Sequence, residues 1–469
     1  MMPAFVLRNR MSAMLPVEKF FSLRTCSYFF FSVLFFINSS CANNKQQPPV
    51  ATKDSSSAIL KLPPPTQLPK AEADRISQIC EAYYDSALKP KGFNGGIIVA
   101  KGGNILFERY AGTGHIPGKD SINASTPFHI ASVSKTFTAM AVLKLVEEGK
   151  INLDDELSRY LPKFNYPGVT IRTLLSHRSG IPNYAYFMAD LGWDVKTWMT
   201  NLDMFQWMTT NKALIQNVGT PNTRFMYSNT NFALLAILIR VISGQEYADY
   251  LKKTFFLPLQ MNNTFVFSPE DINKVNPSYD WKGRLQPFNY LDAVYGDKNI
   301  YTTCRDLLIW DRALKSGLLF KEATLREAYA PYSNERPGVK NYGLGWHLNI
   351  YPNGKKMIFH NGWWHGNNAV FIRLLDEDAT IILTGNKYTR AIYHAKQLAT
   401  IFGGYDLQDE EDENSGLKPP ENSAAAPDTQ QPATNGLLEK KPSKKDQRLK
   451  EMLKDKHREM MLEKSKRFH

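Results

Sequence analysis

The chain has 469 residues, of which 43% are hydrophobic and 12% aromatic. It can therefore bury a large core, which excludes a chain that is disordered along its whole length. The formal net charge is +12, but residues 406–439 carry nine acidic residues against one lysine, and residues 440–469 carry twelve basic residues against five acidic ones. The charges of the tail nearly cancel, so the tail is not the source of the excess positive charge. Because the distribution of charge matters more than its sum, the net charge alone does not indicate nucleic acid as a partner, and we expect none.

The first 41 residues have the features of an export signal. Lys19 and Arg24 precede an apolar run over 27–37, which is too short to span a bilayer as a mature helix but suits the core of a signal peptide. Small serines stand directly before Cys41, an arrangement that resembles a bacterial lipoprotein cleavage site and implies a lipid on Cys41. The sequence thus predicts an exported, membrane-anchored protein of the cell envelope that faces the periplasm or the cell exterior. A short buried apolar segment is the alternative.

Composition then divides the rest of the chain into a tether, a domain and a tail. Residues 42–74 are polar and rich in proline and serine, as in a tether. The folded domain is expected over 75–404. Residues 405–469 form a charged, low-complexity tail in which 445–465 has the spacing of a basic helix. That helix is expected either to be solvated or to contact anionic lipid or another acidic surface.

Within the domain, two stretches of strand pattern enclose a helical region. Residues 95–100 and 105–110 flank a Lys-Gly-Gly-Asn turn and predict an antiparallel hairpin. The middle of the domain, 157–290, reads as short helices and loops. We therefore expect an α+β fold, with an antiparallel sheet of about five strands flanked by helices and a mainly helical lobe. The remaining expected elements are helices over 72–88, 136–146, 231–242 and 391–402 and strands over 342–350, 355–360, 368–375 and 379–384.

The cysteines and histidines show no metal-binding pattern. No His-Glu-x-x-His and no Cys-x-x-Cys is present, so we assign no metal and no cofactor. If the signal is removed and Cys41 is lipidated, Cys80 and Cys304 remain in the domain. They are expected either to pair or to be two buried free thiols.

Ser132 and Lys135 stand at the start of a long apolar segment. Thr136–Val146 is rich in Ala, Leu, Val, Phe and Met, and Gly149 follows where a helix favours a left-handed residue. Residues three apart share one face of the first turn, and a serine beside a lysine with a lowered pKa is a nucleophile beside its base. The Ser-x-x-Lys pattern occurs twice more in the chain, so an N-cap serine and a surface lysine are the alternative.

Two further motifs offer partners for Ser132. Tyr227 and Asn229, two residues apart on a loop, can exchange protons and hold a substrate carbonyl. His360 ends a strand, where it could donate to the substrate or tune the other groups, and Gly362 would let a substrate backbone approach. The N–H group of Trp363 could join that of Ser132 in an oxyanion hole. Each motif taken alone has a commoner structural explanation: Tyr-x-Asn is often a turn, and a single histidine in a strand is more often structural than catalytic.

In this order and spacing, the motifs resemble the active site of the penicillin-recognising serine hydrolases. These are the serine β-lactamases, the D-alanyl-D-alanine carboxypeptidases and related esterases and D-aminopeptidases. The resemblance covers about 75–404 and extends to the segments 174–182 and 306–310. It implies a β-lactamase/transpeptidase-like fold. It also implies catalytic roles for Ser132, Lys135, Tyr227 and His360, and substrate binding by Asn229, Asn361, Gly362 and Trp363.

Departures from the family pattern narrow the expected activity. A histidine at position 360 is more like the carboxypeptidase and esterase side of the family, where the true β-lactamases of this branch have a lysine. Asn361 replaces a hydroxyl residue that in the family binds a substrate carboxylate. Trp363 and Trp364 suggest an apolar or flat group beside the site.

We therefore expect an exported serine hydrolase that forms an acyl-enzyme on Ser132 with an ester or amide. Its substrate would be a small-molecule or peptide-like compound, and its class would be esterase, D-amino-acid peptidase or carboxypeptidase, or β-lactamase-like enzyme. The alternative function is a binding or sensing protein on the same fold that does not turn substrate over. The oligomeric state is left open.

Overall fold

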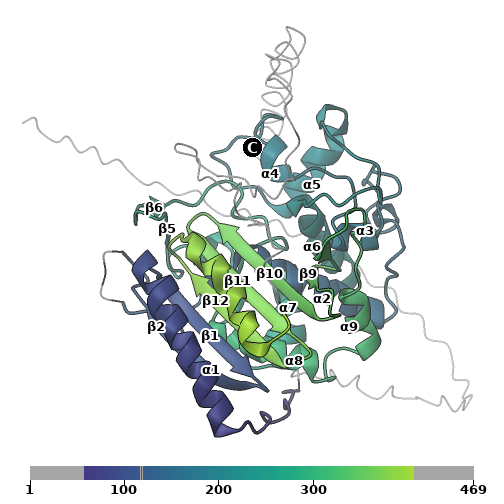
Figure 1. The fold of residues 1–469 in the computed structure, drawn as a ribbon. Helices are drawn as coiled ribbons and strands as arrows, with labels where there is room; N and C mark the ends of the chain where they lie inside the picture. The colour runs from purple at the N-terminus through teal and green to yellow at the C-terminus, as the bar shows by residue number, and fades with distance from the viewer. Residues whose placement is uncertain (1–57, 117, 119, 406–469) are drawn as a thin grey trace, which may run out of the picture. The chain divides into compact units, whose positions relative to one another are not determined.

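Short apolar runs joined by tight turns form a central seven-stranded sheet, shown in Figure 1. This computed structural model describes residues 58–405 apart from 117 and 119. The predicted signal with Cys41, most of the tether, and the tail with its basic helix lie outside the described residues. Within that part of the chain, no helix is long and apolar enough to cross a membrane.

The sheet is antiparallel throughout and is built from both ends of the domain. Its strand order is β2-β1-β12-β11-β10-β9-β8. The first hairpin therefore pairs with the last strand, in a register that places Gly95 opposite Gly385. The strands are β1 Gly95–Lys101, β2 Asn104–Ala111, β8 Lys340–Tyr342, β9 His347–Ile350, β10 Lys356–Trp364, β11 Asn367–Leu374 and β12 Ala379–Gly385.

Both faces of the sheet are covered, so its central strands are apolar on both sides. Every residue of β11 and β12 is buried. One face packs against helix α1, Lys70–Tyr83, and the 3-10 helix Arg390–Phe402, which lie across the front of the sheet in Figure 1. The other face packs against helices α2, Ser134–Glu147, and α8, Cys304–Lys315, and against the helical lobe.

The helical lobe surrounds one long helix. Helix α6, Asn229–Ser243, is buried over its first eleven residues and stops at Gly244, whose φ is 68°. The other helices are α3 Ile171–Leu175, α4 Tyr184–Phe187, α5 Asn201–Thr210, α7 Tyr247–Leu251 and α9 Glu322–Ala328. Short strands complete the domain: β3 Phe128–His129, β7 Ile300–Thr302 and β4 Phe265–Val266 form one small sheet, and β5 Ser278–Tyr279 pairs with β6 Leu285–Gln286.

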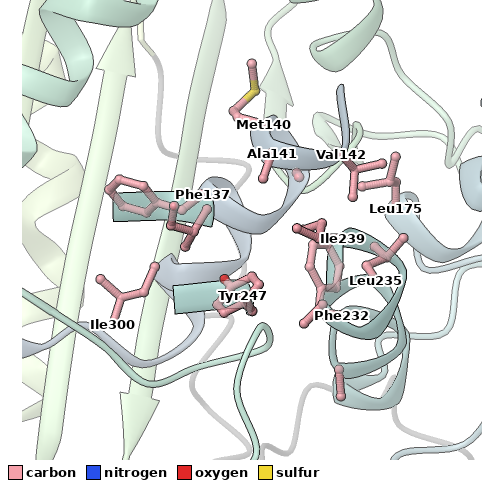
Figure 2. Close-up of a cluster of buried hydrophobic side chains, with 14 of the residues drawn as sticks. Phe137, Met140, Ala141, Val142, Leu175, Phe232, Leu235, Ile239, Tyr247 and Ile300 are labelled. Atoms are coloured by element: carbon pink, nitrogen blue, oxygen red, sulfur yellow. The ribbon is translucent and has the colours of Figure 1, made fainter. Parts of the chain in front are cut away.

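Helix α2 is buried on nearly all sides because it lies between the sheet and the lobe. Figure 2 shows its apolar side chains facing those of α6, α7 and strand β7. Phe137 stacks on Trp310 of α8 with ring centroids 4.6 Å apart. This packing fixes the start of α2, where Ser132 and Lys135 stand, relative to both halves of the domain.

The predicted fold class is confirmed, and several details differ. The sheet has seven strands where about five were expected, because all six predicted strand segments join it and the segment 342–350 is divided into β8 and β9. Helix α1 ends at Tyr83, and a π-helical turn continues to Leu88. The closing segment 391–402 is 3-10 helical.

The tether prediction is wrong for residues 58–74. Residues 58–69 pack on the domain, with the N–H of Leu60 bonded to the Pro258 carbonyl (2.8 Å) and that of Thr66 to the Gly102 carbonyl (2.8 Å). Leu60 and Leu62 contribute apolar side chains to the core, which composition averaged over the segment could not reveal. Cys80 and Cys304 are both buried free thiols.

Candidate active site

Ser132 lies in a 3-10 turn, Ala131–Val133, directly before α2. The preceding residue, Ala131, has a φ of 46°, a left-handed conformation that is strained for a residue with a side chain. The N–H of Ala131 donates to Nδ1 of His129 (3.1 Å). Nε2 of His129 lies 3.0 Å from the Asn299 amide oxygen and therefore carries the ring proton. The buried pair His129 and Asn299 thus holds the backbone in the shape that presents Ser132.

Lys135 contacts Ser132 from one turn further along. Its Nζ lies 2.9 Å from Ser132 Oγ and 2.9 Å from the Asp297 carbonyl oxygen. Ser132 is 7% exposed and Lys135 is 0% exposed, so the alternative of a surface lysine is wrong. The two groups have the separation that a nucleophile and its base require.

Tyr227 and Asn229 approach this pair from the lobe. The ring of Tyr227 lies 4.9 Å from Lys135 Nζ, measured to the ring centroid. Asn229 is the first residue of α6 and is 4% exposed. Its side-chain oxygen has no hydrogen-bond partner within the described part of the chain. This oxygen is thus buried and unsatisfied by the described residues, and its binding of a substrate stays a prediction.

His177 holds the Tyr227 loop, a role that the sequence did not suggest. Its Nδ1 accepts from the Ser228 N–H and from the Asn231 side-chain amide, both at 3.1 Å, and its ring centroid lies 4.2 Å from that of Tyr227. Burial, and then the charge of Lys135, lower the pKa of His177 well below its ordinary value. His177 is therefore a neutral acceptor. The 174–182 segment had contributed only to the family resemblance.

His360 reaches the same group of rings from β10. Its ring centroid lies 6.3 Å from that of Tyr227. Its Nδ1 lies 2.7 Å from the Asn361 carbonyl oxygen and must carry a proton, because a carbonyl only accepts. Its Nε2 lies 3.4 Å from the Tyr342 hydroxyl. When His360 is neutral, its proton is on Nδ1 and Nε2 can only accept. The sequence hypothesis that His360 donates to a substrate therefore requires the doubly protonated ring.

Gly362 is required by the protein's own packing. A Cβ atom at this position would lie 2.2 Å from the Ile130 carbonyl oxygen and 3.2 Å from the Ala131 Cβ. Strand β10 thus passes directly against the turn that carries Ser132. The glycine is therefore needed for this contact with the segment that carries Ser132, and its proposed role beside a substrate backbone stays a prediction.

The side chain of Trp363 lies on the opposite face of the sheet from Ser132. It packs against Tyr388, at 5.5 Å between ring centroids, in the cluster beneath α1. Asn361 stands two residues before Trp363 in β10, so its side chain lies on the same face as the Trp363 ring and away from Ser132. Its side-chain oxygen is unpaired within 58–405. The prediction that Trp363 supplies an apolar wall beside the site is therefore wrong, and only its backbone N–H is available for an oxyanion hole. Trp364 faces the Ser132 side but is buried, with its indole N–H bonded to Asp292.

A second set of buried polar groups adjoins Lys135 and was missed in the sequence. Asp297 and Lys298 form an ion pair with 3.3 Å between Oδ2 and Nζ. The Tyr184 hydroxyl lies 3.1 Å from the same carboxylate oxygen. Gly296-Asp297-Lys298-Asn299 has no turn or helix pattern that would mark it as part of a site, and only its position beside α2 identifies it.

A large groove of the described domain lies away from these groups, and no metal cluster is found among the described residues. A groove of about 920 Å³ lies at the other end of β10, lined by Lys356, Ile358 and residues of α8 and α9, and none of the site residues lines it. Among the described residues, no group of three or more His, Cys, Asp or Glu side chains could hold a metal ion. The grouping around Ser132 therefore defines the candidate site.

Comparisons with known proteins show the family and the fold of the chain. A family profile described as Beta-lactamase matches residues 84–401. Penicillin-binding protein 4* of Bacillus subtilis is 34% identical over 337 residues, which is 67% of this chain and 74% of that protein. The penicillin-binding protein homologue of Pyrococcus abyssi, described as octameric, superposes with a TM-score of 0.61 at 25% identity, covering 71% of this chain and 78% of that one. D-amino acid amidase from Ochrobactrum anthropi has the same fold at 21% identity, with a TM-score of 0.55 over 71% of this chain and 96% of that one.

Proposed function

The chain belongs to the β-lactamase family, and on that premise we propose that it is an exported serine hydrolase that forms an acyl-enzyme on Ser132. The observation that carries the proposal is the buried contact of 2.9 Å between Lys135 Nζ and Ser132 Oγ. Burying an amine is costly, so a fully buried lysine in contact with a serine hydroxyl at the start of a helix favours a chemical role for the pair. A structural role for Lys135 would be met by an apolar side chain.

The proposed reaction proceeds in two steps. In the first, Ser132 Oγ attacks the carbonyl carbon of an ester or amide, and its proton passes to the Lys135 and Tyr227 pair. That proton then goes to the departing alcohol or amine as the C–O or C–N bond breaks. In the second, water attacks the acyl group, the same pair accepts the water proton, and Ser132 recovers a proton as the acid leaves. The N–H groups of Ser132 and Trp363 are suited to the oxyanion in both steps.

The proposed substrates are esters and amides of D-amino acids or related peptide-like compounds. His360 in place of a lysine favours the carboxypeptidase and esterase side of the family over true β-lactamases. The unpaired amide oxygen of Asn229 offers an acceptor for a substrate N–H. The amidase with the same fold acts on D-amino acids according to its name, and we extend that chemistry to this chain as part of the proposal.

Labelling with a fluorescent penicillin and a fluorophosphonate tests the nucleophile. We expect both probes to label the wild type and neither to label Ser132→Ala. Ser86→Ala is the matched control, because Ser86 and Lys89 repeat the Ser-x-x-Lys spacing on an exposed turn. Labelling that persists in Ser132→Ala would exclude Ser132 as the nucleophile. Labelling without turnover of a panel of D-amino-acid amides, esters and β-lactams would establish the binding or sensing protein instead.

Export and lipid anchoring are part of the same proposal and rest on the signal at 1–41. Mass spectrometry of the mature protein should find an N-terminus at Cys41 that carries lipid, with the domain facing the periplasm or the cell exterior. The variant Cys41→Ser should be released into the soluble fraction or remain unprocessed. An unmodified or uncleaved wild-type N-terminus would contradict this part of the proposal.

A further inference from the structure

The segment Gly296–Ile300 lies along the start of α2 and is tied to it at four points. The Thr138 hydroxyl donates to the Gly296 carbonyl (2.6 Å), and Lys135 Nζ donates to the Asp297 carbonyl (2.9 Å). The Ile300 N–H donates to the Ser134 hydroxyl (3.1 Å), and the Ile300 carbonyl accepts from the Ile130 N–H (3.0 Å). The segment is therefore in register with the nucleophile turn and with Lys135.

This segment places two opposite charges in the interior, on Asp297, whose backbone carbonyl accepts from Lys135, and on the next residue, Lys298. The side chain of Asp297 is 0% exposed and that of Lys298 is 3% exposed. Lys298 Nζ lies 5.2 Å from the centroid of the Tyr184 ring and 4.7 Å from that of Trp364. The ammonium donates to the Tyr184 hydroxyl, lies against the Trp364 ring and has Asp297 as its counter-charge.

Stability alone does not account for this ion pair. Buried ion pairs are often no more stabilising than apolar residues of similar volume, because both charges lose their hydration. One carboxylate oxygen of Asp297, Oδ1, has no hydrogen-bond partner among the residues that the structure describes. The pair is therefore incompletely satisfied, and it adjoins the one lysine whose charge the proposed reaction requires to change.

We propose that Asp297 and Lys298 are positioning residues that set the charge state of the Lys135 and Tyr227 pair. The inference rests on the proposed function. The Asp297 carbonyl orients the Lys135 amine, the Asp297 carboxylate favours the protonated amine, and the Lys298 ammonium opposes it. The two charges therefore act on the base with opposite signs.

Other titratable groups that face Lys135 do not supply this balance. His177 packs between α3 and α6, and burial lowers its pKa well below the ordinary value. His347 of β9 is neutral for the same reason, with a pKa lowered to about 3. Burial raises the pKa of Tyr184, so its hydroxyl stays protonated. His360 of β10 lies beside the Tyr342 hydroxyl. The substitutions at Asp297 and Lys298 leave His360 in place.

The test is the pH dependence of Ser132 acylation by a fluorescent penicillin or a fluorophosphonate. The rate rises with pH as the base loses its proton, and the midpoint of that rise reports the pKa of the base in the free enzyme. We expect Asp297→Asn to move the midpoint to lower pH and Lys298→Met to move it to higher pH. As a general scale, two unit charges about 6–10 Å apart at an effective dielectric constant of about 20 shift a pKa by roughly one to two units. We therefore expect each single variant to shift the midpoint by roughly one pH unit. On the acid side of the profile this equals a change of about tenfold in the acylation rate, measured relative to the plateau of the same variant.

The double variant Asp297→Asn/Lys298→Met removes both charges and should return the midpoint close to that of the wild type. If Lys298→Met does not fold, the inference is tested by the other two variants: the midpoint of Asp297→Asn should be shifted to lower pH, and that of the double variant should not. Asp306→Asn is the matched control, because this buried carboxylate bonds to Thr264 and Asn263 outside the site, and its midpoint should not move.

Unshifted midpoints, or shifts of the same sign in both single variants, would overturn the inference. That outcome is separate from failure of the proposed function, which would appear as labelling or turnover that survives Ser132→Ala. The acylation readout also stays valid if no natural substrate is turned over, because it needs only the first step.

Discussion

Substituting Gly362 by alanine should separate strand β10 from the nucleophile turn. The added Cβ would lie 2.2 Å from the Ile130 carbonyl oxygen, against ordinary contact at 3.4 Å or more. The strand or the turn must therefore move by about 1.2 Å. Neither side of the contact is flexible, because the nearest atom belongs to the backbone and β10 is paired with β11 along its length.

Two effects follow from a displacement of that size. Overpacking of a well-ordered interior costs about 1–3 kcal/mol of unfolding free energy. A misplacement of about 1 Å between a nucleophile and the groups that receive the developing charge reduces the rate by about 100-fold. We therefore expect Gly362→Ala to fold with lowered stability and to acylate about 100 times more slowly.

Urea unfolding and the rate of fluorophosphonate labelling measure the two effects separately. Gly354→Ala, in the turn before β10, is the control. Its φ of 84° is strained for alanine, but no atom lies within 4 Å of the new Cβ, so it should lose about 1 kcal/mol of stability and keep the wild-type labelling rate. A Gly362→Ala protein with wild-type stability and labelling rate would refute the proposed contact between β10 and the Ser132 turn.

Three other predictions concern the core and its titratable groups. Phe137→Ala removes a fully buried ring stacked on Trp310 and should lower the free energy of unfolding in urea by about 3–5 kcal/mol; a loss below about 1 kcal/mol would contradict the packing in Figure 2. Burial lowers the pKa of His129 to about 4, so this histidine takes up a proton in the unfolded state first. The contribution of His129 to stability should therefore fall by about 2 kcal/mol between pH 7 and pH 5, and His129→Gln should reduce the total fall of the protein, to which His177 and His347 also contribute, by about that amount. Burial raises the thiol pKa of Cys80 and of Cys304 to about 12, so a thiol reagent should modify them only after denaturant is added, and rapid labelling of the native protein would contradict their burial.

Local patterns in the sequence predicted the elements that carry the chemistry. The apolar run after Ser132, ended by Gly149 with a φ of 68°, predicted helix α2. The glycine turn at 101–104 predicted the first hairpin, which is observed as β1 and β2. These signals are readable because helix ends and tight turns depend on residues only a few positions apart.

Other features depend on side-chain direction, which a one-residue change in register reverses. Trp363 was expected beside the site, yet its position in β10 directs its ring to the face covered by α1. Gly362 was assigned to the substrate, yet its nearest neighbour is Ile130. Sequence order alone cannot show on which face of a covered sheet a residue lies, because both faces are apolar.

The sequence by itself determined which groups can do chemistry here: a serine and a lysine one helical turn apart, followed by a phenol, an amide and an imidazole in the order of a known family. Only the tertiary structure decided which of them meet, and which groups surround them. Asp297, Lys298 and His177 lie far from Lys135 along the chain and belong to no recognisable catalytic motif, yet packing of the lobe and β7 against α2 brings all three to its amine or to the Tyr227 loop. The physical reason is that spacing and turn chemistry act within a few residues, whereas burial, charge pairing and the approach of one backbone to another depend on contacts between distant segments.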